Sequence, residues 1–284
     1  MVISMSKRTT LTVIFATILA MPPMSTEAGG MDMLYKSIDS KGKSDSGINY
    51  LLDRIGRKNK GNNVKVVTNK EELKELEKDE KLKGQLLGID VSKWNGDINW
   101  KEVKEAGIEF AIIRAGYGQS TVDIQFERNI KGCIENDIYV GVYWFSYAYT
   151  NDMAVKEAQF CQKIIKPYKE HVKLGVWFDF EYDSTAYATR HGVHITKDKC
   201  TNIAYAFCKE IERGGYQAGI YTNIDYANNY FTKQILEEYN VWIADWSAVC
   251  RYDGKYLIWQ YTDGGEVKGI NGKVDMDWYY GDKK

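Results

Sequence analysis

The sequence predicts an α/β protein built on a short parallel β barrel. From residue 86 onward, short apolar runs of strand type alternate with amphipathic runs of helical periodicity. Repeated units of this kind imply parallel strands joined by right-handed crossovers. No GxGxxG or GxxxxGKS/T motif opens the first helix, which counts against the alternative, an open doubly wound sheet that binds a nucleotide. Residues 86–281 are fewer than the roughly 250 typical of an eight-stranded barrel, so we expect a trimmed or irregular one.

The first half of this region is expected to hold four strands, each followed by a helix. In chain order these pairs are Leu86–Val91 with Trp100–Ala106, Phe110–Ala115 with Phe126–Asn136, Tyr139–Tyr147 with Asp152–Ile165, and Gly175–Tyr182 with Lys197–Arg213. The second half begins with a strand over Ala218–Thr222 and a short helical stretch that ends at Tyr239. Three further strands follow, over Val241–Trp246, Tyr256–Tyr261 and Lys273–Trp278. The last two are typical of a hairpin-rich ending.

The amino-acid composition argues against some classes of function and favours others. The chain has 284 residues, of which 44% are apolar, and 38 basic residues nearly cancel 39 acidic ones. That apolar content can bury a core, and the net charge of −1 argues against nucleic-acid binding. A content of three histidines argues against a histidine-rich metal centre. Tyrosine (21) and tryptophan (8) together greatly exceed phenylalanine (9), which suits a groove that faces a sugar or a partner.

The first residues have the pattern of a secretory signal. Lys7 and Arg8 precede an apolar run over residues 11–21, and small residues follow over 25–29. The run is too short to span a bilayer, although an uncleaved signal anchor is the alternative. We therefore expect residues 1–28 to be a signal peptide and the mature chain to be secreted or cell-wall associated. No later segment resembles a membrane span.

Residues 29–85 are expected to form a charged spacer. This stretch is polar and poor in aromatic residues, and Thr68 or Asn69 could cap a helix that continues through residues 71–76. A cell-surface tether is the alternative. Of the five cysteines, Cys200 and Cys208 lie about 12 Å apart along one expected helix and so cannot form a disulfide. We expect the cysteines to be mostly small buried hydrophobic residues.

Carboxylates follow the fourth strand at the position where parallel barrels carry their active sites. Alternation along a strand would place Asp179, Glu181 and Asp183 on one face, opposite Phe178. Two neighbouring carboxyls repel, so the pKa of one should rise and leave it able to act as a general acid. Asp90 ends the first strand in the same way. Glycoside cleavage needs one carboxyl that donates a proton and a second that stays ionised. A Mg²⁺ site is the alternative use of these acids, but no phosphate-cradling loop in the sequence supports it.

Other strand ends carry aromatic and amide side chains. These candidate substrate-binding residues are Tyr143, Tyr221, Trp242, Trp259 and Gln260. Rings at the rim of a cleft can stack on sugar faces, and amides can bond hydroxyls, although core packing is an alternative role for each. His191 and His194 lie in an expected loop without a third ligand, so we expect no metal there.

Several ordered motifs resemble family 25 of the glycoside hydrolases, the muramidases of the Chalaropsis-type lysozyme group. The opening segment 88–100 (GIDVSKWNGDINW) resembles the family's first signature, and 110–118 (FAIIRAGYG) resembles its second strand. Asp179-Phe180-Glu181 occupies the family's DxE position, and the segments 242–244, 259–261 and 269–275 resemble its later motifs. Two departures are Asp277, where asparagine is more usual, and Asp245-Trp246, where an aromatic residue commonly sits nearer.

The resemblance implies a modified α/β barrel of about eight strands, the last ones partly antiparallel, with residues 86–284 as the catalytic barrel. It implies cleavage of the β-1,4 bond between N-acetylmuramic acid and N-acetylglucosamine in bacterial peptidoglycan, without metal or cofactor. Glu181 would be the proton donor, and Asp90, Asp179 and Asp275 would complete an acidic cluster. The second step stays open between attack by the substrate's acetamido group and direct attack by Asp179. We expect a monomer; a chitinase-like glycosidase and a non-catalytic wall-binding module are the alternatives.

Overall fold

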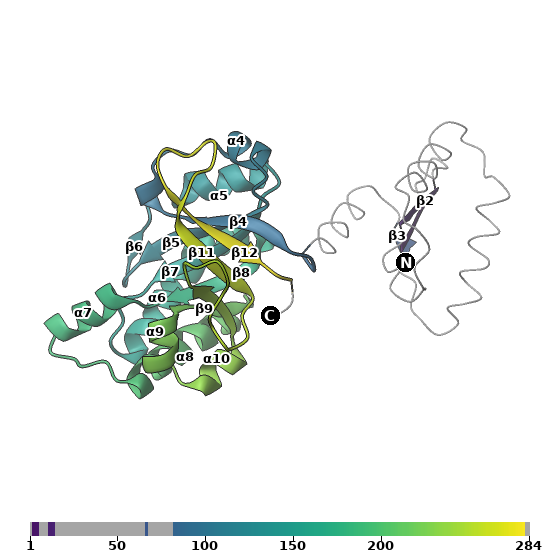
Figure 1. Ribbon diagram of the computed structural model, residues 1–284. Helices are drawn as coiled ribbons and strands as arrows, with labels where there is room; N and C mark the ends of the chain where they lie inside the picture. The colour runs from purple at the N-terminus through teal and green to yellow at the C-terminus, as the bar shows by residue number, and fades with distance from the viewer. Residues whose placement is uncertain (1, 6–10, 15–65, 68–81, 282–284) are drawn as a thin grey trace. The chain divides into compact units, whose positions relative to one another are not determined.

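The computed structural model describes residues 2–5, 11–14, 66–67 and 82–281 (Figure 1). The chain divides into two compact units, Met1–Leu82 and Lys83–Lys284. In the first unit, strand β1 (Val2–Met5) pairs antiparallel with β2 (Leu11–Ile14) and parallel with β3 (Val66–Val67). Most of the expected signal peptide, and the helix expected over 71–76, lie outside the described residues.

Eight strands of the second unit close into a barrel. They are β4 (Leu86–Val91), β5 (Phe110–Tyr117), β7 (Tyr139–Phe145), β8 (Val172–Asp179), β9 (Ala218–Asn223), β10 (Asn240–Ala244), β11 (Ile258–Gly265) and β12 (Val274–Tyr279). Each pairs with the next around the ring, and the pairing of β4 with β5 closes it, while the short β6 (Thr121–Val122) adds to the edge of β5. Seven strands are parallel, and β12 runs antiparallel to both β11 and β4. The expected barrel with a partly antiparallel ending is confirmed, and the open sheet is excluded.

Helices cover the outside of the barrel (Figure 1). They are α4 (Trp100–Glu105), α5 (Phe126–Glu135), α6 (Asn151–Ile165), α7 (Tyr182–Arg190), α8 (Lys197–Arg213), α9 (Ile224–Asn229) and α10 (Lys233–Glu238), with short 3₁₀ turns η1 (Lys93–Asn95) and η2 (Lys166–His171). Side-chain caps begin the two longest: Thr150 Oγ1 accepts from the Met153 amide, and Thr196 Oγ1 from the Lys199 amide. Within the described residues, no helix has the length and apolarity needed to cross a membrane.

Buried side chains form two layers because neighbours on a strand alternate faces. On the outer face of β8, Phe178 packs against Phe207 of α8, with ring centroids 5.1 Å apart. On the inner face, Trp177 meets Trp242 of β10 at 6.0 Å. Gly219 on β9 leaves room for this inner ring, since a Cβ there would lie 2.4 Å from Trp177. The interior is therefore filled by large side chains, and it is not a pore.

The fourth strand begins and ends three residues earlier in the chain than its predicted range, Gly175–Tyr182. It ends at Asp179, and Glu181 is the N-cap of α7, so the prediction that Asp183 shares a strand face with Asp179 is wrong. Phe180 stays buried and stacks on Phe178, but Asp183 is exposed in the first turn of α7. The helix begins here because Ser184 Oγ accepts the backbone N–H of Glu181, a bond that the strand pattern does not reveal.

The cysteines behave as expected. Cys133, Cys161, Cys200 and Cys208 are buried, Cys250 is half-buried, and all five are free thiols. The prediction that Cys200 and Cys208 do not pair is therefore confirmed.

Candidate active site

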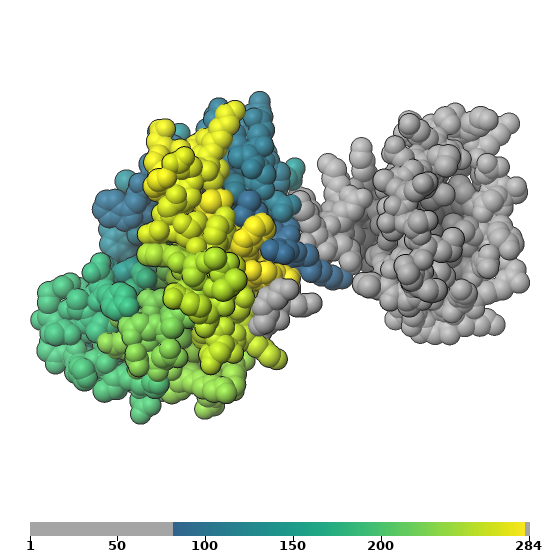
Figure 2. All heavy atoms as spheres, in the orientation of Figure 1, coloured from purple at the N-terminus to yellow at the C-terminus, as the bar shows by residue number. Residues whose placement is uncertain are grey.

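Four carboxyls predicted from the sequence meet at one end of the barrel. Asp90 lies near the end of β4, Asp179 ends β8, and Glu181 follows two residues later. Because β12 runs in the opposite direction, its beginning lies at this end, where Asp275 pairs directly with Asp90. The segments involved come from opposite ends of the barrel region and lie side by side in the fold (Figure 2). We refer to these four carboxyls as the acid cluster.

Asp90 is held by an amide network. It is buried, and its Oδ2 accepts a hydrogen bond of 2.7 Å from Gln260 Nε2. Gln260 Oε1 in turn accepts from Tyr221 Oη (3.3 Å) and Trp246 Nε1 (3.0 Å). Burial and the charges of nearby acids, Asp275 first, raise the pKa of Asp90, while the Gln260 bond opposes the shift. The network therefore orients Asp90 and favours its charged form.

Arg114 of β5 is a basic side chain whose charge acts on Asp179. Burial and then the charge of Glu181 raise the pKa of Asp179, and the Arg114 guanidinium lowers it. Arg114 is itself buried and anchored, since its Nε donates to Asp123 Oδ2 at 2.7 Å. Asp179 Oδ1 and Arg114 Nη2 are both buried without a hydrogen-bonding partner among the described residues. This cation makes ionisation of Asp179 less costly than burial alone would allow.

Glu181 has the electrostatics of a general acid. Burial raises its pKa to about 7, the charges of Asp183 and Asp275 add to the shift, and side-chain hydrogen bonding with Tyr221 opposes it. Burial and the charge of Asp263 raise the pKa of Asp275 to about 6. Near neutral pH a protonated Glu181 can therefore lie beside other carboxyls of the same mouth, which is the arrangement that acid-assisted bond cleavage requires.

The predicted binding residues separate into two groups. Tyr143, Tyr221 and Gln260 are buried and belong to the barrel interior at or below the acid cluster. Trp242 is 1% exposed, and its ring packs against Tyr143 (6.0 Å) and Tyr221 (4.6 Å), so it supports the site from beneath. Trp259 alternates to the outer face, where it packs on the core and its Nε1 donates to the Asp245 carbonyl at 2.8 Å. Trp242 therefore has no exposed face on which a sugar could stack, whereas Trp259 is half-buried.

Three exposed rings lie at the mouth in addition to the five predicted substrate-binding residues. Trp94 (79% exposed) follows β4, Tyr182 (58%) follows β8, and Trp246 (57%) follows β10. Lys93 lies over the Trp94 ring at 4.7 Å from its centroid. The signal that could have found them is an aromatic residue just beyond the carboxyl end of a parallel strand, because that position faces the mouth.

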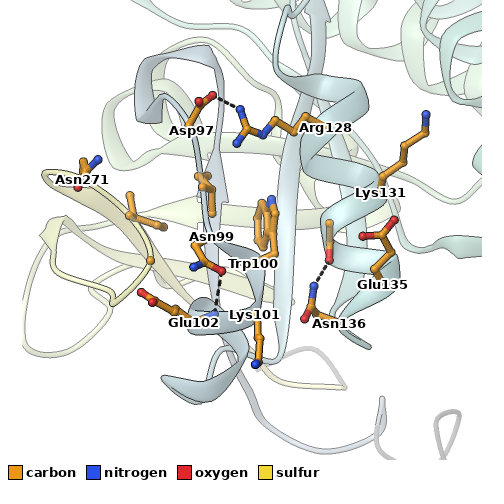
Figure 3. Close-up of a pocket in the computed structure, with 14 residues that line it drawn as sticks. Asp97, Asn99, Trp100, Lys101, Glu102, Arg128, Lys131, Glu135, Asn136 and Asn271 are labelled. Carbon is orange, nitrogen blue, oxygen red and sulfur yellow. Dashed lines mark hydrogen bonds and ion pairs between the residues drawn. The ribbon is translucent and has the colours of Figure 1, made fainter.

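A separate hollow lies on the flank of the barrel, between α4, α5 and the connection that precedes β12 (Figure 3). No member of the acid cluster lines it. Its polar groups bond one another: Arg128 pairs with Asp97, Asn99 Oδ1 caps α4 at Glu102, and Asn136 Nδ2 donates to the Gly132 carbonyl. These contacts cap the start of α4, bond the end of α5 and join α5 to the segment before α4. We assign the hollow no function.

Comparison with known proteins places this acid-lined barrel in a family. Residues 89–270 match the model described as "Glycosyl hydrolases family 25". The chain belongs to this family. The matched region includes Asp90, Asp179 and Glu181, and Asp275 follows just beyond it. The resemblance drawn from the sequence motifs is thus confirmed, and this family 25 member is a glycoside hydrolase.

Relatives of this family 25 member include named lysozymes. Lysozyme M1 of Streptomyces globisporus is 28% identical over 200 residues, which cover 68% of this chain and 67% of that protein. The autolytic lysozyme of Clostridium acetobutylicum is 24% identical over 193 residues, covering 68% and 55%. Among solved structures, the modular autolysin LytC of Streptococcus pneumoniae matches with a TM-score of 0.60 at 26% identity. That match covers 69% of this chain and 47% of the autolysin, so the chain spans about half of its length.

Proposed function

We propose that this family 25 member is a muramidase, which cleaves the β-1,4 bond between N-acetylmuramic acid and N-acetylglucosamine in bacterial peptidoglycan. The observation that carries the proposal is Glu181, a carboxyl with a pKa near 7 at a mouth where Asp179 lies two residues away. The lysozyme names of its relatives, and a structure of the pneumococcal autolysin with a synthetic peptidoglycan ligand, support the substrate class.

In the first step, Glu181 donates its proton to the glycosidic oxygen. A carboxyl with a pKa of about 7 is still largely protonated in mildly acidic to neutral solution, yet acidic enough to give up the proton as the bond breaks. The departing sugar thereby leaves as a neutral alcohol. Positive charge then develops at the anomeric carbon of the muramic acid residue, as in other glycoside hydrolyses.

In the second step, Asp179 stabilises this positive charge. We propose that the substrate's own 2-acetamido oxygen attacks the anomeric carbon and that Asp179 supports the resulting cation, with direct attack by Asp179 as the alternative. Water then attacks the anomeric carbon and gives a proton to the Glu181 carboxylate, which releases the muramic acid reducing end and restores the acid. Arg114 supports the ionised form of Asp179 in either route. Asp90 and Asp275 place two further carboxyls at the same mouth, and the exposed rings of Trp94, Tyr182 and Trp246 offer faces for neighbouring sugars.

We also propose that the enzyme acts outside the cytoplasm, secreted or attached to the cell wall, because its substrate lies there and residues 1–28 have the composition of a signal peptide. Residues 29–85 would then be a spacer ahead of the catalytic barrel. A monomer suffices for this chemistry, since all four proposed catalytic carboxyls come from one barrel.

The test is digestion of purified peptidoglycan by the full chain, with products identified by mass spectrometry. We expect new reducing ends on muramic acid, and a loss of about 10²–10⁴-fold in rate for Glu181→Gln, the range usual for general acids. Glu170→Gln, an exposed glutamate in η2 at the opposite end of β8, is the matched control and should retain full rate. Release of reducing ends on glucosamine, or from chitin instead, would favour the chitinase-like alternative. Binding without any cleavage would favour the wall-binding module.

A further inference from the structure

Lys93 is a cation at the mouth of the barrel that the mechanism above does not use. It begins η1, two residues beyond the end of β4 and three residues after Asp90 of the acid cluster. Its backbone N–H donates to Asp123 Oδ2 at 3.0 Å, which fixes the start of η1 against the residues that follow β6. The Lys93 side chain is half-buried, so its ammonium group is confined to a limited space beside the mouth.

Two aromatic rings hold the Lys93 ammonium. Its Nζ lies 4.7 Å from the ring centroid of Trp94 and 5.5 Å from that of Tyr117, the last residue of β5. Both distances are within the roughly 6 Å over which a cation is attracted to the face of a ring. The rings attract the ammonium without neutralising its charge, and Trp94, which is 79% exposed, still presents ring surface to solvent. A charged group and an open ring surface therefore lie side by side at the mouth.

The acids on the segments next to Lys93 are already paired with other cations. Asp123 forms a buried ion pair with Arg114, whose Nε lies 2.7 Å from Oδ2, and Asp97, just beyond η1, pairs with Arg128. Within the part of the chain that the structure describes, no carboxylate forms an ion pair with Lys93. Its positive charge is therefore left without a partner of opposite sign.

Lys93 also does not act as a counter-ion for three members of the acid cluster. The pKa values of Asp179, Glu181 and Asp275 respond to burial, to other acids, to Tyr221 and to Arg114, and the charge of Lys93 is not among these influences. The ammonium is thus available to an anionic group of a ligand that enters the mouth.

The two sugars of peptidoglycan differ by one anionic branch. Muramic acid carries a lactyl ether on O3, which glucosamine lacks, and this branch bears a carboxylate of the lactate itself or of the peptide attached to it. A sugar that stacks on the open surface of Trp94 would bring its branch close to Lys93, because the two residues are adjacent in η1. An ammonium donates a strong, charge-assisted hydrogen bond to a carboxylate. Chitin contains no such group.

We infer that Lys93 is a specificity-determining residue, whose ammonium, held over Trp94 and Tyr117, binds a carboxylate on the lactyl branch of muramic acid. The inference rests on the proposed function, since it explains how this mouth distinguishes peptidoglycan from chitin. Trp94 supplies the contact with the sugar, and Lys93 supplies the contact with the branch. Asp123 holds both residues in place through the backbone N–H of Lys93.

The first test measures binding without cleavage, in the full chain that carries Glu181→Gln. Adding Lys93→Gln should weaken binding of the disaccharide of N-acetylmuramic acid and N-acetylglucosamine about 3–10-fold, because an ion pair is lost. Binding of neutral chitobiose should stay within about twofold, since chitobiose offers the ammonium no carboxylate. Lys93→Arg keeps the charge and should keep the preference, which should shrink for every chain with Lys93 in about 1 M salt.

The same disaccharide with a peptide on its lactyl group separates the two sources of the carboxylate. Weaker binding of the bare disaccharide assigns the contact to the lactate, and weaker binding only of the peptide-bearing form assigns it to the peptide. Equal losses for chitobiose and both anionic ligands, or no loss for any ligand, would overturn the inference.

The second test uses digestion of solubilised peptidoglycan. Lys93→Gln should raise KM about 3–10-fold and keep kcat within about twofold, because the lost contact lies away from the bond that breaks. Lys163→Gln is the matched control and should behave as wild type: Lys163 also lies over a ring, Phe160 at 5.9 Å, but in the last turn of α6, which leads to the far end of the barrel.

An unchanged KM, or a fall in kcat alone, would contradict the assignment of Lys93. A wild-type chain that digests no peptidoglycan would refute the proposed function, and the binding test would still decide on Lys93.

Discussion

Asp90 and Asp275 are direct cross-strand partners at the junction where antiparallel β12 meets β4. The pairing brings together carboxyls from the first and last strands of the barrel, and the charge of Asp275 raises the pKa of Asp90. It depends on strand direction: in a parallel β12, the beginning of the strand would lie at the opposite end, far from the mouth. The reversed strand is thus what completes the acid cluster.

Asp183→Asn should shift the alkaline limb of the pH profile of kcat/KM to lower pH. After burial, the charge of Asp183 is the largest influence that raises the pKa of Glu181 to about 7. Without that charge Glu181 loses its proton at lower pH, so kcat/KM should begin to fall about 0.3–1 pH unit earlier. Asp198→Asn is the matched control, an exposed aspartate in the first turn of α8. Superimposable profiles for wild type and Asp183→Asn would contradict the assignment of the limb to Glu181.

Arg114→Gln should lower both activity and stability. The change removes the cation that lowers the pKa of Asp179 and leaves Asp123 buried without its ion-pair partner, a loss of about 3–5 kcal/mol in unfolding free energy. The double variant Arg114→Gln/Asp123→Asn removes both charges and should recover most of that stability. Its kcat should nevertheless stay about tenfold or more below wild type, since Asp179 still lacks its cation. Recovery of kcat together with stability would show that Arg114 is only structural.

Trp246→Ala should weaken substrate binding. The ring is exposed beside the site, and its Nε1 bonds Gln260, the residue that holds Asp90. Loss of a stacking ring should raise KM about 2–10-fold on solubilised glycan. Trp246→Phe keeps a ring without the donor and should recover most of the KM. Val249→Ala, an exposed apolar residue just beyond, is the control for general effects on this segment.

Glu157→Gln should destabilise the barrel without touching the acid cluster. Glu157 of α6 is buried and accepts from Ser146 Oγ (2.5 Å) and the Tyr147 amide (3.1 Å), which fixes the chain beyond β7. At pH 5 the protonated carboxyl of Glu157 presents one O–H and one carbonyl oxygen to these partners, and the larger –NH₂ group of glutamine fits the 2.5 Å contact with Ser146 Oγ less well, at a cost of about 1 kcal/mol in urea unfolding at pH 5.

The pH dependence of the Glu157 effect has a definite sign. Burial raises the pKa of Glu157 from 4.5 to about 7, so its contribution to stability is full below pH 4.5 and is lost as pH rises through 7. The glutamine variant should therefore be most destabilised relative to wild type in acid and least so above pH 7. A constant difference across this range would contradict the raised pKa.

Much of the site was predictable from local sequence. The alternation of strand and helix predicted the barrel. The sequence motifs also identified the four acids that the structure brings together, which are Asp90, Asp179, Glu181 and Asp275. Boundaries were less predictable. The apolar pattern continues past Asp179, but a single bond from the Glu181 amide to Ser184 Oγ ends the strand there and starts α7.

The sequence by itself determined the family, the order of the strands and the identity of the candidate acids, because these depend on residue type and short-range periodicity. Only the tertiary structure decided which side chains share the mouth. The pairing of β12 with β4 placed Asp275 opposite Asp90, and the closed barrel buried Trp242 beneath the acids, turned Trp259 outward and placed Asp277 deep in the interior. These outcomes depend on pairing between strands far apart in the chain, and periodicity along one strand carries no information about its distant neighbours.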